Sequence, residues 1–120
     1  MYEYGIKIKR VIDGDTVVVD VDLGFGTWLM DKHVRIYGVN TPEKNTPAGK
    51  AAQQYTITFM LEQNPETYRL TVKDHKADKY GRILGSITRL SYETIEATDL
   101  ATKLIADGMG KPYFGGKKDV

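Results

Sequence analysis

Residues 34–43, Val-Arg-Ile-Tyr-Gly-Val-Asn-Thr-Pro-Glu, predict a strand that ends in a defined turn. Apolar residues at the first and third positions alternate with Arg35 and Tyr37, which is the pattern of a half-buried strand. Pro42 has no amide hydrogen to donate to a sheet and restricts the residue before it, so the strand must stop there. The stretch therefore predicts an arginine on a rigid strand, followed by oxygen-bearing side chains and a carboxylate at a turn.

Three antiparallel strands are expected in the first forty residues, the last of them running into this stretch. Polar and apolar residues alternate over residues 4–12 and 16–22, and the Asp13-Gly14 pair between them is a strong hairpin signal. Glycines at positions 24 and 26 mark the next turn, which leads into a long third strand over residues 28–39. This part of the chain therefore predicts a three-stranded meander.

A helix, two strands and a short helix are expected in the rest of the chain. The first helix begins at Pro47 after the capping residue Thr46, and its apolar residues recur every three to four positions. The segments expected after it are strands over residues 68–72 and 82–90, a helix over residues 99–107 capped by Thr98, and irregular structure over residues 111–116.

This order of elements predicts an α+β fold that is mainly β. Five short strands with a helix between the third and the fourth is the order of a five-stranded OB-fold β-barrel, here with a short C-terminal helix. The chain has 120 residues, a usual length for one domain, and no repeat or linker divides it. We therefore expect a single domain over residues 1–120.

Composition and charge exclude several classes of protein. Without cysteine there is no disulfide framework and no thiolate metal site. No apolar run approaches the length of a membrane span, so we expect no membrane association. The first residues show no secretory signal, which favours an intracellular location over a secreted one and leaves both open. The net charge of +1 means that a site for a polyanion must come from local clustering. We interpret the basic residues near the C-terminus, Lys111, Lys117 and Lys118, as a solvated tail.

Three positions could supply oxygen ligands to a hard cation. An Asp-Gly-Asp sequence such as that at Asp15 often forms a turn for purely conformational reasons. Ca²⁺, however, prefers carboxylate, amide and carbonyl oxygens in flexible geometry. Asp15, the Asn40 side chain and the Thr41 backbone carbonyl could supply such oxygens. A structural turn and a calcium site therefore both remain open for Asp15.

Two arginines and one glutamate could act on a phosphate. Arg35 and Arg82 could be ordinary surface charges, but two guanidinium groups on one phosphate would offset the charge that develops in phosphoryl transfer. Glu43 could activate a water molecule beside such a phosphate. The loop of residues 78–81 carries a cation, an aromatic ring and a glycine, a combination that can bind a phosphate and stack on a base.

Taken together, these motifs resemble the staphylococcal nuclease family. The resemblance covers residues 11–16 (Val-Ile-Asp-Gly-Asp-Thr), residues 34–36 with 40–43, and residues 78–82 (Asp-Lys-Tyr-Gly-Arg). Lys111-Pro112-Tyr113 follows, as in that family. Several separated motifs in the same order make the match specific, and the family's OB barrel agrees with the element order above.

The resemblance implies a calcium-dependent phosphodiesterase that acts on DNA and RNA and leaves 3′-phosphate ends. In this family two side chains and one backbone carbonyl bind the metal, a glutamate positions or deprotonates the attacking water, and two arginines hold the scissile phosphate. Further residues bind the neighbouring phosphate and line the nucleotide pocket. Transferred to this sequence, the metal ligands are Asp15, Asn40 and Thr41, the catalytic residues are Arg35, Glu43 and Arg82, and the substrate-binding residues are Lys79, Tyr80 and Tyr113.

This sequence departs from the family pattern at two points, and each departure leads to a separate expectation. Asn40 stands where the best-known member has an aspartate, which predicts weaker calcium affinity because an amide brings no charge. The sequence ends at Val120, where that member continues into another helix, so we expect the surface which that helix would cover to be small, covered by the tail, or buried in a homo-oligomer.

An alternative function belongs to a different class. A non-catalytic OB module would bind single-stranded nucleic acid or a protein partner through aromatic rings and basic grooves. Such binding needs no calcium, whereas hydrolysis by the predicted site should stop when a chelator is added. The metal requirement therefore distinguishes the two readings.

Overall fold

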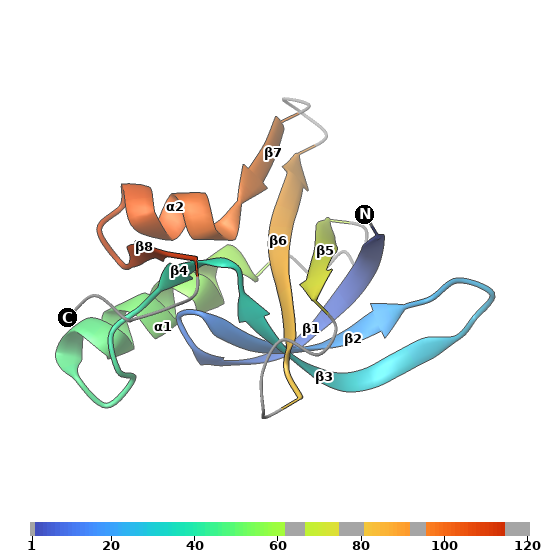
Figure 1. Cartoon of the computed structure of the whole chain (residues 1–120), viewed down its shortest axis with the longest axis horizontal. Helices are drawn as coiled ribbons and strands as arrows, with labels where there is room; N and C mark the ends of the chain where they lie inside the picture. Colours follow the sequence, from blue (N-terminus) through green and yellow to red (C-terminus); the bar gives the residue numbers. More distant parts are fainter. Residues whose placement is uncertain (1, 62–66, 75–80, 92–95, 115–120) are drawn as a thin grey trace.

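The computed structural model describes residues 2–61, 67–74, 81–91 and 96–114. Figure 1 shows strands wound into a barrel, with both helices at one end and the hairpin of the second and third strands projecting at the other. None of the helices in these ranges is long and apolar enough to cross a membrane. The elements in chain order are β1 (Glu3–Asp13), β2 (Thr16–Asp22), β3 (Trp28–Ile36), β4 (Gly38–Asn40), α1 (Pro47–Phe59), β5 (Tyr68–Asp74), β6 (Ile83–Ser91), β7 (Glu96–Asp99), α2 (Leu100–Ala106) and β8 (Lys111–Tyr113).

Five strands close the barrel because β3 pairs with β6. β2 lies between β1 and β3, while β5 lies between β1 and β6, and all of these pairs are antiparallel. Parallel pairing of Val34 with Ile83 and of Ile36 with Gly85 joins β3 to β6 and completes the ring. A closed five-stranded barrel with α1 between its third and fourth strands confirms the predicted OB fold.

The barrel is filled by apolar side chains from alternate strand positions. Val17 and Val19 of β2 are fully buried, and so are Leu70 of β5 and Ile87 of β6. Burial of such a side chain contributes about 1.5–3 kcal/mol relative to an exposed one. α1 covers one end of the barrel, where the Tyr68 hydroxyl donates to the Phe59 carbonyl at 2.8 Å.

The predicted third strand is wrong in one respect, because it breaks at Tyr37 instead of continuing to Val39. Gly38 has a φ of 89°, a left-handed conformation that favours glycine, and this turns the chain out of the barrel. The segment beyond it, β4, pairs antiparallel with β8. Residues 111–113, predicted to be irregular, therefore form a strand whose partner lies about seventy residues earlier in the sequence.

The caps of the two helices differ in how well the sequence predicted them. Thr46 caps α1 as predicted, with its hydroxyl accepting from the Gly49 amide at 3.0 Å. The predicted Thr98 cap of α2 is wrong, because Thr98 lies in β7 and pairs with β6. Asp99 caps α2 instead, and its carboxylate accepts from the Thr102 amide at 2.9 Å. A β-strand therefore runs directly into this helix.

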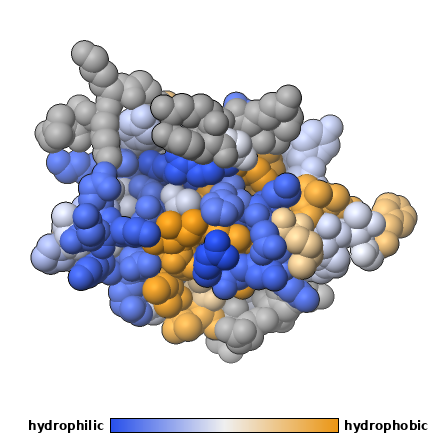
Figure 2. Space-filling view, turned by 90° about the horizontal axis from the view of Figure 1, so that it is seen from below, coloured by the Kyte–Doolittle hydropathy of each residue, from blue (hydrophilic) through white to orange (hydrophobic). Residues whose placement is uncertain are grey.

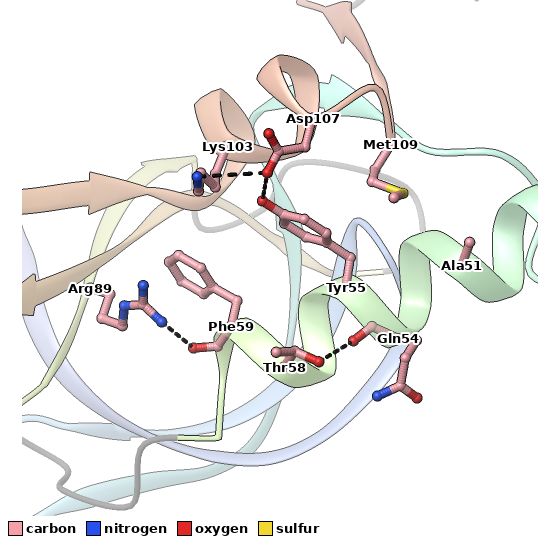
Figure 3. Close-up of a pocket in the computed structure, with 9 residues that line it drawn as sticks. All are labelled: Ala51, Gln54, Tyr55, Thr58, Phe59, Arg89, Lys103, Asp107 and Met109. Carbon is pink, nitrogen blue, oxygen red and sulfur yellow. Dashed lines mark hydrogen bonds and ion pairs between the residues drawn. The ribbon is translucent and has the colours of Figure 1, made fainter.

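The two helices also line a groove of about 330 Å³ (Figure 3). In it, the Tyr55 hydroxyl of α1 donates to the Asp107 carboxylate, which also lies 3.6 Å from Lys103 Nζ. The guanidinium of Arg89 stacks on the Phe59 ring at 4.7 Å from its centroid. None of the predicted metal, catalytic or substrate-binding residues lines this groove.

Candidate active site

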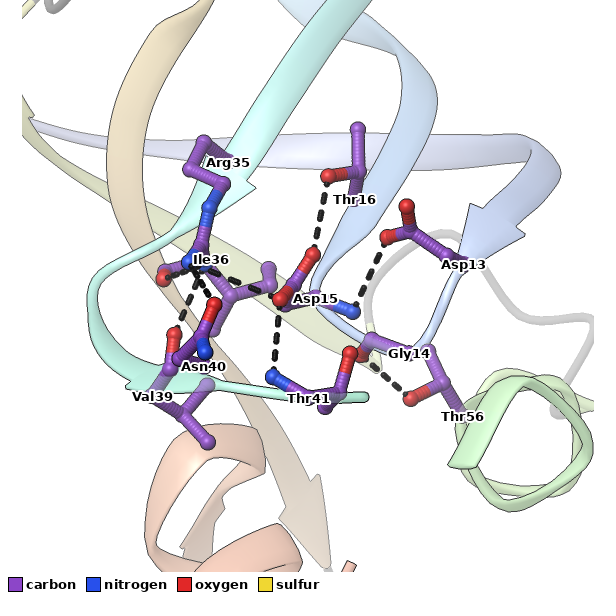
Figure 4. Close-up of polar contacts among 10 residues, drawn as sticks. All are labelled: Asp13, Gly14, Asp15, Thr16, Arg35, Ile36, Val39, Asn40, Thr41 and Thr56. Atoms are coloured by element: carbon purple, nitrogen blue, oxygen red, sulfur yellow. Dashed lines mark hydrogen bonds and ion pairs between the residues drawn. The ribbon is translucent and has the colours of Figure 1, made fainter. Parts of the chain in front are cut away.

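Asp15 is buried at the start of β2 and joins two segments that are distant in the sequence (Figure 4). Its Oδ2 accepts from the Thr41 amide at 2.9 Å, and its Oδ1 accepts from the Thr16 hydroxyl at 3.1 Å. Its backbone carbonyl accepts from the Ile36 amide at 2.8 Å. The β1–β2 turn is therefore fixed to the end of β3 and to the loop after β4.

Arg35 is the centre of the candidate site. Its Nη1 donates to the carbonyls of Ile36 at 2.9 Å and Val39 at 2.7 Å. Its Nη2 donates to Asn40 Oδ1 at 3.3 Å and lies 3.4 Å from Asp15 Oδ2. One guanidinium therefore holds the break after β3 in shape and brings together a predicted catalytic residue and two predicted metal ligands.

Gly14 permits the close approach of the β1–β2 turn to its neighbours. A Cβ on this residue would lie 2.8 Å from Thr41 Cγ2 and 2.9 Å from Ala52 Cβ. The Thr56 hydroxyl of α1 donates to the Gly14 carbonyl at 2.7 Å. Sequence reasoning gave Gly14 only a turn role and missed Thr56, because a single sequence carries no signal for contacts across forty residues.

Glu43 lies in the exposed loop between β4 and α1, and its backbone is fixed by the helix that follows. The Glu43 carbonyl accepts from the Thr46 amide at 3.0 Å and the Thr46 hydroxyl at 2.7 Å. A Cβ on Gly49 would lie only 1.7 Å from the Glu43 carbonyl oxygen. The first turn of α1 therefore packs directly against this loop, and only glycine fits at position 49.

The pKa values of the two aspartates in the turn are shifted in opposite directions. Burial raises the pKa of Asp13 to about 6, and the hydrogen bond and negative charge of Asp15 add to the rise. Burial also opposes ionisation of Asp15, yet the pKa of its carboxyl lies below its usual value. The hydrogen bond shared with Asp13, the charge of Arg35 and the Thr41 amide all favour the Asp15 carboxylate. Asp15 is therefore held as an anion.

The donor atoms of the site suit a hard cation. Asp15, Asn40 and Thr41 offer only oxygen, the ligand type that Ca²⁺ takes from carboxylates, amides and carbonyls. The Thr41 hydroxyl is buried without a hydrogen-bond partner within the described part of the chain. Across the same ranges, no three His, Cys, Asp or Glu side chains group closely enough to hold an ion. Calcium bound beside the Asp15 carboxylate would therefore also need neutral oxygens, water and substrate as ligands.

The substrate-binding residues and the catalytic Arg82, all predicted from the sequence, lie partly within the described residues. Tyr113 of β8 pairs with Gly38, and its ring centroid lies 5.9 Å from Arg35 Cζ. Arg82 is half-buried directly before β6, where Leu84 pairs with Arg35. Lys79 and Tyr80 lie outside the described residues.

The fold and the site together define a class of protein. It is an OB-fold barrel whose charged residues gather around the turn between its first two strands, and strand and loop surfaces of such barrels bind oligonucleotides. The model of the staphylococcal nuclease homologue family matches residues 33–119, and the chain belongs to this family.

Two thermonucleases and one protein of Escherichia coli resemble most of this chain. It is 41% identical over 113 residues to a thermonuclease of Staphylococcus intermedius, covering 89% of this chain and 58% of that protein. It is 36% identical over 118 residues to a thermonuclease of Staphylococcus hyicus, covering 93% and 61%. It is 26% identical over 115 residues to Protein ParB of Escherichia coli, covering 92% and 59%. The chain thus spans about three fifths of the length of these relatives.

Proposed function

We propose that this protein is a calcium-dependent phosphodiesterase that hydrolyses DNA, RNA or both at the bond between phosphorus and the 5′ oxygen, leaving 3′-phosphate ends. Membership of the staphylococcal nuclease homologue family and the likeness to two thermonucleases support a nuclease. The observation that carries the proposal is the Arg35 guanidinium, 3.4 Å from the buried Asp15 carboxylate and 3.3 Å from the Asn40 amide oxygen.

Asp15, Asn40 and the Thr41 carbonyl would hold the calcium ion. Bound calcium would neutralise charge on the phosphate and help to orient it. Asp15 is suited to this role because its carboxylate is kept ionised and its position is fixed by the Thr41 amide. The buried Thr41 hydroxyl, for which the described residues offer no hydrogen-bond partner, gives the site one more oxygen.

Glu43 would position or deprotonate the attacking water. Its loop follows Asn40 and Thr41 directly, and the α1 cap fixes its backbone. A general base must be held at a defined place to act efficiently. The packing of Gly49 against the Glu43 carbonyl supplies that rigidity.

Arg35 and Arg82 would stabilise the charge that develops on the scissile phosphate. The two contacts of Arg35 Nη1 are short, at 2.9 and 2.7 Å, whereas those of Nη2 are long, at 3.3 and 3.4 Å. A phosphate would therefore replace the long contacts of Nη2 at lower cost, while the short contacts of Nη1 anchor the planar guanidinium. Lys79 and Tyr80 would bind the neighbouring phosphate, and Tyr113, beside Arg35, would line the nucleotide pocket.

Hydrolysis of single-stranded DNA and RNA, measured with calcium and with a chelator, tests this proposal. We expect cleavage only with calcium. Glu43→Gln should lower the rate by roughly 10²–10⁴-fold through loss of the base, and Arg82→Ala by roughly 10³–10⁵-fold through loss of transition-state charge stabilisation. Binding without cleavage in any divalent metal would instead establish the non-catalytic OB module.

Asn40→Asp is expected to tighten calcium binding by about tenfold, which corresponds to about 1.4 kcal/mol. The added carboxylate charge would face both the cation and Arg35 Nη2, which already contacts the Asn40 side chain. Calorimetric titration of calcium measures this change. Asn45→Asp is the matched control, because it adds the same charge to the exposed part of the same loop. Equal affinities of Asn40→Asp and the unmodified protein would remove Asn40 from the metal ligands.

A further inference from the structure

One face of α1 contacts both chain segments that carry the candidate site. Gly49, Gln53 and Thr56 follow one another at intervals of four and three residues, so they share one side of the helix. Gly49 packs against the Glu43 carbonyl. Gln53 and Thr56 reach the turn between β1 and β2, which carries Asp15. A single helix therefore touches the loop of the candidate base and the turn of the candidate metal ligand.

Two side chains of this face donate hydrogen bonds to the backbone of the turn. Gln53 Nε2 donates to the Ile12 carbonyl at 3.0 Å. The Thr56 hydroxyl donates to the Gly14 carbonyl at 2.7 Å (Figure 4). Because the peptide unit is planar, a bond that holds the Gly14 carbonyl also fixes the amide and the Cα atom of Asp15. Thr56 therefore fixes the backbone of the residue whose carboxylate would bind calcium.

Asp15 is held at two ends by two different parts of the fold. Its carboxylate accepts from the Thr41 amide at 2.9 Å, in the loop after β4. Its backbone is held through Gly14 by Thr56 of α1. A carboxylate whose main chain could move would keep its charge but would present its oxygens in a different place, and a metal ligand depends on its supporting bonds for its orientation. The bond from α1 thus fixes where the carboxylate lies.

The hydrogen bond between Thr56 and Gly14 is closed to solvent and to substrate. Thr56 is fully buried, and a Cβ on Gly14 would lie only 2.9 Å from Ala52 Cβ. A buried carbonyl that loses its donor is costly, so the turn is expected to shift when the hydroxyl is removed. The surface at the end of the molecule where α1 begins is mainly hydrophilic (Figure 2), and Thr56 takes no part in it. An effect of Thr56 on catalysis must therefore pass through the turn.

We infer that Thr56 is a positioning residue that holds the metal ligand Asp15 through the Gly14 carbonyl, a role that rests on the proposed calcium-dependent nuclease function. Gln53 supports the same turn from the preceding position on the helix face. Residues that orient a metal ligand without touching the metal contribute roughly 10–100-fold in metal affinity or activity. We expect the contribution of the Thr56 hydroxyl to lie within this range.

Thr56→Val removes the hydroxyl and keeps the branched shape of the side chain. We expect calcium affinity to fall roughly 10–100-fold, because the Asp15 carboxylate would no longer be held in place. The hydrolysis rate at saturating substrate should fall as well, while the KM for nucleic acid stays close to that of the unmodified protein, because the buried Thr56 does not touch substrate. Calorimetric titration of calcium and steady-state hydrolysis of single-stranded DNA measure these quantities.

Thr56→Ser and Thr58→Val separate the position of the turn from the stability of the fold. Serine loses a buried methyl group, which lowers stability, but it keeps the donor, so calcium affinity should remain near that of the unmodified protein. Thr58 is exposed on the same helix, and its hydroxyl donates to the Gln54 carbonyl at 3.0 Å, within α1. Thr58→Val makes the same chemical change away from the turn and should alter neither calcium affinity nor rate. The thermal midpoints of all three variants establish that each is folded in the assays.

Hydrogen exchange of the Thr41 amide, measured without calcium, reports on the turn independently of catalysis. This amide donates to Asp15 Oδ2, so it should exchange about tenfold or more faster in Thr56→Val than in Thr58→Val. If the unmodified protein does not hydrolyse nucleic acid with calcium, the proposed function fails, whereas faster Thr41 exchange in Thr56→Val would still show that Thr56 holds the turn. Unchanged calcium affinity or unchanged Thr41 exchange in Thr56→Val would overturn the inference, and so would a Thr56→Ser variant as impaired as Thr56→Val.

Discussion

Arg35→Lys is expected to lower the rate of nucleic-acid hydrolysis by about three orders of magnitude or more. Lysine keeps the positive charge beside Asp15 but is a point charge with three donors, whereas the arginine fork reaches four oxygens at once. One ammonium nitrogen cannot occupy both the position of Nη1, beside the Val39 carbonyl, and that of Nη2, where a phosphate would bind. Single-turnover rates at saturating calcium measure the loss directly.

The same substitution should also lower stability, since the Val39 and Ile36 carbonyls would lose a donor, each at a cost of roughly 1–3 kcal/mol where the group is buried. Arg89→Lys is the matched control. Arg89 is another half-buried arginine, and it contacts the Phe59 carbonyl at 3.4 Å and stacks on the Phe59 ring, away from the candidate site. The Arg89→Lys variant should be less stable than the unmodified protein but should hydrolyse nucleic acid at the same rate. A fully active Arg35→Lys would show that Arg35 serves only the fold.

Gly49→Ala is expected to reduce both stability and activity. The added Cβ would lie 1.7 Å from the Glu43 carbonyl oxygen and 2.8 Å from Lys44 Cα, so either α1 or the loop must move. Overpacking of this kind costs roughly 1–3 kcal/mol, although alanine is intrinsically the better helix residue by roughly 0.5–1 kcal/mol. Displacement of Glu43 should lower the hydrolysis rate as well.

Chemical denaturation and calcium-dependent hydrolysis, measured side by side, test this prediction. Gly5→Ala is the matched control, because the nearest atom to its added Cβ would be Arg69 Nη1 at 3.8 Å, an ordinary contact. The Gly5→Ala variant should change neither the stability nor the hydrolysis rate by much. If Gly49→Ala were as stable and as active as the unmodified protein, the packing of α1 against the loop would not position Glu43.

Several elements could be predicted from the sequence because their signals are local. Alternation of apolar and polar residues marked β1 and β2, and Asp13-Gly14 marked the turn between them. Thr46 and Pro47 marked the start of α1, because a capping oxygen and a missing amide hydrogen act within one helical turn. The ordered motifs around Asp15 and Arg35 also identified the family that the comparison shows.

The tertiary structure alone decided where these elements meet. The break after β3 depends on Gly38 and on the pairing of β4 with β8, which no local pattern encodes. The meeting of Arg35 with Asp15, Asn40 and Tyr113 depends on closure of the barrel through β3 and β6. Glycine is required at positions 14 and 49 because another backbone or side chain occupies the space of the missing Cβ, and no local pattern indicates this. Periodicity and capping act over a few residues, whereas these contacts join residues up to 78 positions apart, and only the folded chain brings them together.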